Sequence, residues 1–333
     1  MNSLLSRRGT KPTTDAAAPA PRRIHNATCA IAVVGGLFVF KELVCAPTKL
    51  SLCDTAGVSS TTLVKGTSTG VFPFAEYVQQ HTTRQPAARR ACPCCGWTGN
   101  EMNPIGSMFS SKARADAKCP NCGSRERHRK TCAYLGYHAD TLFQQHEPNK
   151  NFRLLHFGPV PIMETALDLA PNVEQIGLDF FAKGYDGKYS GSTLHADLTN
   201  LQLPTNFANG AIILHVMEHV PDLDKAKAEL HRVLKNNANS WALIEVPIFS
   251  TTGKNEDCRD MTNQERIKCG GQDDHLWAFD VQDFQTNVLG DFDCTIVDDE
   301  LRRVLGAEVY ESFRLEYAPL GTNVPGFFCR FRL

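Results

Sequence analysis

The stretch "NFRLLHFGPVPIMETALDLA", residues 151–170, decides the fold, because an apolar run stops at a glycine and two prolines just before a helical pattern begins. We expect a strand over 153–158 and a helix over 161–170. Turns of this kind often bind nucleotides and usually carry two or three glycines, whereas this one has only Gly158. Gly158 permits a tight turn, and Pro161 suits the first helical turn, where its missing amide proton is no loss. The pattern predicts a variant cofactor-binding turn.

The chain continues to alternate apolar runs with helical patterns after this turn. Further strands are expected over 173–180, 210–216 and 240–249, and a second helix is expected over 222–235. Alternation of this kind predicts an α/β fold, in which helices cover both faces of a parallel sheet. Ligands of such sheets bind at the carboxyl ends of the strands.

Polar residues follow several of these strands. Asp179 closes the second strand 21 residues after Gly158, a spacing at which an acid can accept hydrogen bonds from both ribose hydroxyls. Asp197 follows an expected third strand, where an acid can accept from the exocyclic amine of adenine. His215, Glu218 and His219 follow the fourth. We expect His215 to line the pocket and His219 to be structural.

Several segments in this order resemble the class I methyltransferases that use S-adenosylmethionine, of the type 11 kind with an "HVLEHV" motif. They are "LLHFGPVP", "GLDF", "ADLTNLQLP" and "LHVMEHVPDLDKAKAELHRVLK". The segments "CPNCGSRERHR" and "GGQDDHLWAFDVQDF" resemble a subgroup in which a cysteine knuckle precedes the domain. The resemblance covers about residues 150–333. It implies a seven-stranded Rossmann-like sheet over 149–333, S-adenosylmethionine as cofactor, and methyl transfer to an oxygen or nitrogen acceptor.

The resemblance also implies which residues bind the cofactor. In the first motif of the family an acid precedes three spaced glycines. Here His156 stands at the acid, Gly158 at the first glycine, and Val160 and Ile162 at the other two. The expected cofactor-binding residues are His156, Gly158, Asp179, Asp197 and His215. The missing glycines depart from the family pattern at the position that contacts the cofactor, so they affect the expected cofactor affinity. The alternative is a methyltransferase-like scaffold that does not catalyse methyl transfer.

Methyl transfer needs the acceptor to be placed behind the methyl group, so positioning supplies much of the acceleration. The expected general base is His275, with Asp274 orienting its ring, and His215 is a further catalytic candidate. Gln272 and Asp273 are the expected substrate contacts. The charged segment 251–268 before them is long enough to form a lid. In the alternative reading, His275 only packs this loop.

A cysteine-rich module is expected over 86–148. Its two Cys-Pro-x-Cys-Gly turns, "CPCCGW" and "CPNCGS", place Cys92, Cys95, Cys119 and Cys122 in a pattern typical of a closed tetrahedral zinc site. Four thiolates leave no open position, so such a zinc ion is structural. Two disulfides are the alternative, and Cys94 is the expected spare thiol.

A basic segment follows the second cysteine turn. We expect Ser124 to cap a helix whose first turns carry Arg125, Arg127, His128, Arg129 and Lys130. These residues either clamp anionic groups of a substrate or form a solvated helix face. A binding module that uses the knuckles and this helix, with an inert main domain, is therefore a second function class. The formal net charge of −1 gives no strong signal for a nucleic-acid partner.

The N-terminal part divides into a basic tail over 1–23, a short apolar segment over 24–46 and a Ser/Thr/Gly-rich stalk or linker over 47–85. Positive residues before an apolar run, followed by a stalk, indicate a single-pass signal anchor of the secretory pathway. A cleaved signal, an organelle transit segment and an apolar tail on a cytoplasmic protein are the alternatives. An NAD or nucleotide-sugar enzyme would be expected to show more glycines at the turn. The methyl acceptor is not identified by the sequence.

Overall fold

The computed structural model of the protein describes residues 90–106, 114–143, 151–167, 172–181, 193–250, 252–316 and 325–331. These residues all belong to one compact unit, which spans 63–333. The expected tail, anchor and stalk all lie outside the described residues. Within the described part of the chain, no helix has the length and apolar character needed to cross a bilayer.

A seven-stranded sheet forms the centre of the main domain. Its strands are β5 (Phe152–Phe157), β6 (Val173–Asp179), β7 (Leu194–His195), β8 (Gly210–Leu214), β9 (Trp241–Glu245), β12 (Phe292–Ile296) and β13 (Gly326–Phe331). Their spatial order is β12-β13-β9-β8-β5-β6-β7. The pairs β7–β6, β6–β5, β5–β8 and β8–β9 are parallel, and β13 runs antiparallel to both of its neighbours. This mixed sheet with one reversed strand is the Rossmann-like sheet of methyltransferases.

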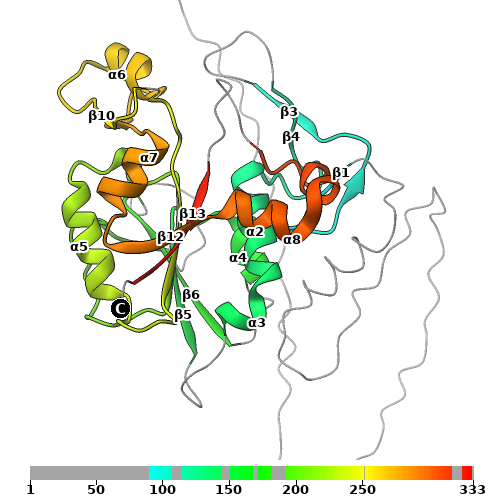
Figure 1. Cartoon of the computed structure of the whole chain (residues 1–333), viewed down its shortest axis with the longest axis horizontal. Coiled ribbons are helices and arrows are strands. Elements are labelled where there is room, and N and C mark those ends of the chain that lie inside the picture. The colour runs from blue at the N-terminus through cyan, green and yellow to red at the C-terminus, as the bar shows by residue number, and fades with distance from the viewer. Residues whose placement is uncertain are drawn as a thin grey trace, which may run out of the picture. The chain divides into compact units, whose positions relative to one another are not determined.

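Helices cover both faces of this sheet (Figure 1). One layer contains α2 (Glu126–Tyr137), α3 (Ala139–Leu142), α4 (Pro161–Leu167) and α8 (Val297–Ser312). The other contains α5 (Leu223–Val233), α7 (Val281–Asp283) and the π-helix η2 (Phe284–Val288). Each layer has its own apolar core, because strand side chains alternate between the faces. Leu154 contributes to the first core, and Leu155 and Phe157 contribute to the second.

The expected elements are confirmed. The strands and helices predicted over 153–158, 161–170, 173–180, 210–216, 222–235 and 240–249 correspond to β5, α4, β6, β8, α5 and β9. The helix α5 begins where Asp222 caps it by accepting a hydrogen bond from the amide of Lys225 at 3.0 Å. Its Ala226, Leu230 and Val233 are buried, as the spacing indicates.

The cysteine-rich module consists of two small antiparallel ribbons followed by α2. The ribbons pair β1 (Arg90–Ala91) with β2 (Thr98–Gly99), and β3 (Asn103–Ile105) with β4 (Arg114–Lys118). The N-cap of α2 is Arg125 and not Ser124. The buried Ser124 instead places its hydroxyl 3.2 Å from the sulfurs of both Cys92 and Cys122. The expected cap by Ser124 is therefore wrong, because the cysteine cluster uses its side chain.

The buried Arg129 connects the module to the end of α8. Its guanidinium donates to the carbonyl oxygens of Ala117 and Ser124 in the module, and to those of Phe313 and Arg314 after α8. The donor–acceptor distances lie between 2.7 and 3.1 Å. The alternative of a solvated helix face is therefore wrong for this residue.

The ammonium group of Lys130 lies in the interior between two carboxylates. Its Nζ is 3.2 Å from Glu245 Oε2 at the end of β9 and 3.1 Å from Asp298 Oδ1 in the first turn of α8. Burial alone lowers the pKa of Lys130, but the two carboxylates outweigh burial and raise it. Asp298 also accepts hydrogen bonds from the hydroxyl of Tyr310 at 2.7 Å and from the amide of Gly326 at 3.0 Å. One ion network thus joins α2, β9, α8 and β13.

Three disulfides connect further parts of the described chain. They pair Cys94 with Cys132, Cys258 with Cys269, and Cys294 with Cys329. The first joins a knuckle to α2, and the third joins β12 to β13. The expectation that Cys94 is a spare thiol is wrong, because α2 brings Cys132 next to it.

Replacing the buried lysine tests how much the ion network contributes. We expect Lys130→Met to lower the free energy of unfolding by about 3–5 kcal/mol, because it removes the ammonium group that two buried carboxylates share. Chemical denaturation measures this change. As a control, Lys225→Met removes an exposed ammonium group that pairs with Asp222, and it should leave the denaturation midpoint unchanged. Equal midpoints for Lys130→Met and the parent would contradict a stabilising network.

Candidate active site

The carboxyl ends of β5, β6 and β8 meet at Gly158. This residue has a φ of +59°, a conformation that glycine adopts at little cost. Its amide donates to the carbonyl oxygen of Leu178 at 2.9 Å. A Cβ added at Gly158 would lie 3.6 Å from Val216 Cγ2 and 4.0 Å from Asp179 Oδ2. The turn therefore lies beside the acid at the end of β6, as the methyltransferase resemblance implies.

Two half-buried carboxylates lie after β6 and β7. Asp179 Oδ1 accepts from the amide of Phe181 at 2.6 Å. Asp197 Oδ1 accepts from both the amide and the hydroxyl of Thr199, each at 2.8 Å. These local bonds hold the two carboxylates in place. A carboxylate has about four lone-pair positions, so both acids fit the task of accepting hydrogen bonds from a nucleoside.

His156 lies in the interior of β5. Burial lowers its pKa to about 4, so the ring is neutral at physiological pH. Its Nδ1 has no hydrogen-bond partner in the described part of the chain. The ring therefore supplies no negative charge at the position where the family has an acid.

His215 follows β8 and has a φ of +56°, which is uncommon for a residue with a side chain and is often found at functional sites. Its Nδ1 is 3.5 Å from Glu218 Oε1, and its Nε2 is 3.4 Å from Glu245 Oε1. Burial alone lowers the pKa of His215, but these two carboxylates outweigh burial and raise it. The imidazole is thus held between two acids at the end of the central strands.

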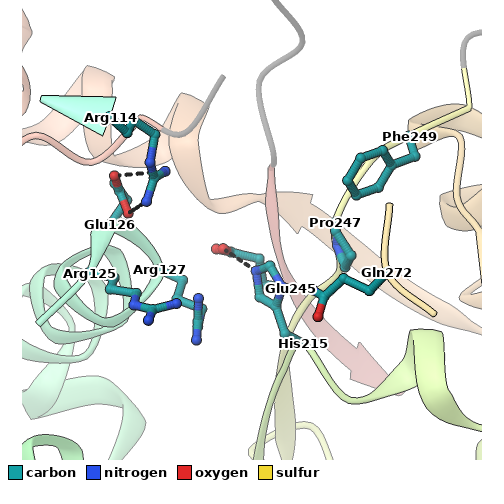
Figure 2. Close-up of a pocket in the computed structure, with 9 residues that line it drawn as sticks. All are labelled: Arg114, Arg125, Glu126, Arg127, His215, Glu245, Pro247, Phe249 and Gln272. Carbon is teal, nitrogen blue, oxygen red and sulfur yellow. Dashed lines mark hydrogen bonds and ion pairs between the residues drawn. The ribbon is translucent and has the colours of Figure 1, made fainter. Parts of the chain in front are cut away.

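A pocket with an empty volume of about 530 Å³ opens beside His215 (Figure 2). Its lining comes from three parts of the chain: Arg114, Arg125, Glu126 and Arg127 from β4 and α2, His215, Glu245, Pro247 and Phe249 from the ends of β8 and β9, and Gln272. Arg114 pairs with Glu126 at 3.0 Å. Within the described residues, Arg125 and Arg127 form no ion pair, and Figure 2 shows them side by side near the imidazole. The pocket is therefore basic on its α2 side.

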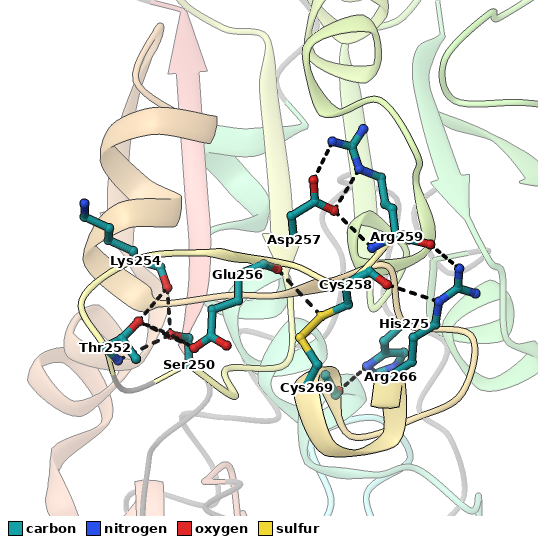
Figure 3. Close-up of a disulfide and its surroundings, with 11 residues drawn as sticks. Ser250, Thr252, Lys254, Glu256, Asp257, Cys258, Arg259, Arg266, Cys269 and His275 are labelled. Atoms are coloured by element: carbon teal, nitrogen blue, oxygen red, sulfur yellow. Dashed lines mark hydrogen bonds and ion pairs between the residues drawn. A yellow bond between two sulfur atoms is a disulfide. The ribbon is translucent and has the colours of Figure 1, made fainter. Parts of the chain in front are cut away.

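The segment after β9 forms an ordered cover. A ribbon pairs β10 (Glu256–Asp257) with β11 (Trp277–Ala278), and the enclosed loop contains α6 (Asn263–Gly270) and the Cys258–Cys269 disulfide (Figure 3). The amide of Leu276 donates to the carbonyl oxygen of Glu218 at 2.7 Å, and the indole of Trp277 donates to that of Val220 at 2.8 Å. Within the predicted lid segment, 251–268, the guanidinium of Arg259 donates to the carbonyl oxygen of Pro221 at 2.9 Å, so this segment too is bound to the turn that follows His215.

The expected site residues of the cover segment, Gln272 to His275, do not all face the pocket. Gln272 lines the pocket, whereas Asp273 is exposed. Asp274 does not contact the ring of His275: its carboxylate lies 3.5 Å from Nδ1 of His219. The buried His275 instead contacts the carbonyl oxygen of Gly270 through Nδ1. The expected Asp274–His275 pair is therefore not formed, because the two side chains point to different neighbours.

The four cysteines of the knuckles form a separate cluster. The sulfurs of Cys92 and Cys122 are 3.6 Å apart, and those of Cys95 and Cys119 are 3.7 Å apart. Zinc–sulfur bonds of about 2.3 Å in a tetrahedron put sulfurs about 3.8 Å apart, so the cluster fits one zinc ion. The amides of Gly96 and Gly123 close the two knuckle turns on the carbonyls of Cys92 and Cys119, each at 2.9 Å. These four thiols are the free cysteines of the described residues.

Several residues at this site were not found from the sequence. Glu245 lies within the stretch 240–249, which reads only as a strand, and Lys130 reads as one of several charges on a helix. The signal that could have identified Glu245 is a carboxylate inside an otherwise apolar strand.

Comparisons with known proteins agree with this arrangement. Residues 160–240 match a family model described as a methyltransferase domain. A search of curated proteins found no match. Among solved structures, the chain is similar to the YcgJ protein of Bacillus subtilis, with 17% identity over 59% of this chain and 94% of that one and a TM-score of 0.34. It is also similar to a SAM dependent methyltransferase from Archaeoglobus fulgidus, with 17% identity over 61% and 93% of the two chains and a TM-score of 0.37.

Residues 160–240 thus carry the sequence pattern of a methyltransferase domain, and the strand order of the main domain is that of the Rossmann-like methyltransferase sheet.

The state of the cysteines is directly measurable. We expect metal analysis of the purified protein to find zinc bound at the four-cysteine cluster, and Cys119→Ser to remove about one zinc ion per chain, because it opens the tetrahedral shell. Peptide mapping without reduction should recover Cys94–Cys132, Cys258–Cys269 and Cys294–Cys329 as disulfides. Disulfides among Cys92, Cys95, Cys119 and Cys122 would refute the zinc site.

Proposed function

We propose that the protein transfers a methyl group from S-adenosylmethionine to an oxygen or nitrogen atom of an acceptor that carries an anionic group. The observation that carries the proposal is that Gly158, Asp179 and Val216 meet at the carboxyl edge of a Rossmann-like sheet. The neighbour of Val216 in the sequence, His215, lines the pocket.

In this proposal, different residues contact the cofactor and the acceptor. Asp179 and Asp197 are placed to accept hydrogen bonds from the ribose and the adenine of the cofactor, and Gly158 leaves room for its methionine end. S-adenosylmethionine supplies an electrophilic methyl group on a sulfonium. An in-line displacement needs no covalent nucleophile, so the contribution expected of the chain is positioning of the acceptor and exclusion of water.

His215 is the proposed contact with the reacting atom of the acceptor. It lines the pocket, whereas His275 is buried and has one ring nitrogen directed at a backbone carbonyl. Gln272 also lines the pocket and is a second proposed contact. We keep His275 and Asp274 as a hypothesis for acid–base chemistry only if the cover segment opens.

The anionic acceptor is inferred from the α2 side of the pocket. Burial and the neighbouring Arg125 lower the pKa of Arg127, but a guanidinium remains charged at physiological pH. Within the part of the chain that the structure describes, neither guanidinium pairs with a carboxylate, and two such groups match the geometry of a phosphate or carboxylate group. The zinc module thus supplies part of the proposed substrate site.

The disulfides support the proposal that the folded domain lies in an oxidising compartment, such as the lumen of the secretory pathway. This agrees with the expected signal anchor over 24–46. Recovery of the six paired cysteines as free thiols from the native source would contradict it.

Cofactor binding is the first test of the proposed function. We expect calorimetry to detect binding of S-adenosylmethionine, and Asp179→Ala to weaken it roughly tenfold or more, because hydrogen bonds to a charged group contribute about 1.5–3 kcal/mol. Asp293→Ala, which alters an exposed acid on β12, serves as the control and should bind normally. If neither S-adenosylmethionine nor its demethylated product binds, the alternative of a binding module with an inert domain gains support.

The acceptor class is tested with matched acceptors. A methyl-transfer screen should compare phosphorylated or carboxylated compounds with their uncharged analogues, and we expect the anionic members to be preferred. Arg127→Gln should raise KM for an anionic acceptor about 10- to 100-fold, the equivalent of one charge-assisted hydrogen bond, and leave cofactor affinity unchanged. Arg153→Gln removes a surface guanidinium that pairs with Glu174 and is the control. A preference for uncharged acceptors would contradict this assignment.

A further inference from the structure

A second cluster of metal-ligating side chains lies where the cover segment packs on the turn after β8. Glu218 and His219 belong to the short helix η1 (Met217–His219), and His275 comes from the cover segment. One side-chain ligand atom from each of the three residues lies within 4.8 Å of the others. The side chain of Glu218 is 1% exposed and that of His219 is 35% exposed. Glu218 and His275 are therefore buried, and the cluster is accessible from the side of His219.

Backbone contacts define which nitrogen of each histidine is free to bind. Nδ1 of His275 contacts the carbonyl oxygen of Gly270, and Nδ1 of His219 lies 3.2 Å from the carbonyl oxygen of Asp274. A carbonyl oxygen only accepts hydrogen bonds, so each Nδ1 carries the hydrogen and each neutral ring keeps its lone pair on Nε2. Histidines that bind metals are commonly oriented in this way by a carbonyl or carboxylate.

The third member of the cluster, Glu218, has unmet bonding capacity. Neither of its carboxylate oxygens has a hydrogen-bond partner in the described part of the chain, and neither has Nε2 of His275. The nearest basic nitrogens to Glu218 Oε1 are His215 Nδ1 at 3.5 Å and His219 Nε2 at 3.9 Å. Two imidazole lone pairs and a buried carboxylate thus face one small space, an arrangement that suits a metal cation in addition to the ion pair of Glu218 with His215.

We propose that Glu218, His219 and His275 bind a divalent transition-metal ion. Two imidazole nitrogens and one carboxylate oxygen are a ligand set typical of zinc, iron(II), manganese and cobalt sites. Metal–ligand bonds of about 2.0–2.2 Å require the three side chains to move closer together by roughly an ångström or less. Three protein ligands leave coordination positions open, and the exposed edge of His219 gives access to them. The ion joins the cover segment to the turn after β8, and its binding does not depend on methyl transfer.

Cobalt(II) is the probe for the unaltered protein. Protein whose four-cysteine cluster has first been filled with zinc is titrated with cobalt(II). We expect about one cobalt ion per chain to bind, with weak visible absorption bands and without the intense near-ultraviolet bands of cobalt–thiolate bonds. Binding should also raise the melting temperature. The absence of such bands together with an unchanged melting temperature overturns the proposal.

Variants identify the ligands. His219→Gln should weaken cobalt(II) binding by more than the roughly 10- to 100-fold that follows loss of a residue that only hydrogen-bonds to a metal ligand, and Glu218→Gln should do the same. Because the His219 ring is partly exposed, its replacement leaves folding intact, which circular dichroism checks. The matched control is His138→Gln, since His138 lies 3.6 Å from Glu300 without a third ligand, and it should bind cobalt(II) as the parent does. Unchanged binding by a folded His219→Gln variant refutes the assignment.

Discussion

The ammonium group of Lys130 between Glu245 and Asp298 is the interaction on which the arrangement of the site depends. A charge in the interior is tolerated only when it is paired, and here the partners come from β9 and from the start of α8. The same Glu245 contacts His215. The position of α2, and with it the position of the pocket arginines, is thereby coupled to the imidazole at the end of β8. A single carboxylate serves both the fold and the pocket.

The guanidinium of Arg129 complements this ion network with hydrogen bonds to the backbone. It binds carbonyls in the knuckle region and beyond α8 at once, so neither end can shift without breaking a buried hydrogen bond. Adjacent residues of one helix thus make different kinds of long-range contact. Lys130 neutralises carboxylates of the sheet domain, and Arg129 hydrogen-bonds to backbone carbonyl groups of the module and of the segment after α8.

Much of this structure could be predicted from the sequence, because its elements are encoded locally. The apolar period and the turn residues around Gly158 give the strand and helix of the first unit, and the spacing of the two knuckles predicts the cluster of Cys92 and its partners. The disulfides could not be predicted, since their pairing depends on the tertiary fold. The roles of Lys130 and Asp274 were also beyond local patterns. In the sequence, Lys130 lies among arginines and is expected to be exposed, whereas in the fold β9 and α8 supply its counter-ions. Asp274 is next to His275 in the sequence, whereas in the fold its carboxylate lies beside His219.

The contacts of α2 bear on how the chain can be divided. The helix follows the zinc knuckles in sequence, yet its buried face belongs to the apolar core beneath the sheet, through Ala133, Tyr134 and Leu135. A chain that begins at β5 would expose that core. It would also leave Glu245 and Asp298 without the ammonium group of Lys130. The knuckles therefore cannot be replaced independently of the main domain, and substitutions that alter the pocket through this module have to preserve the buried face of α2.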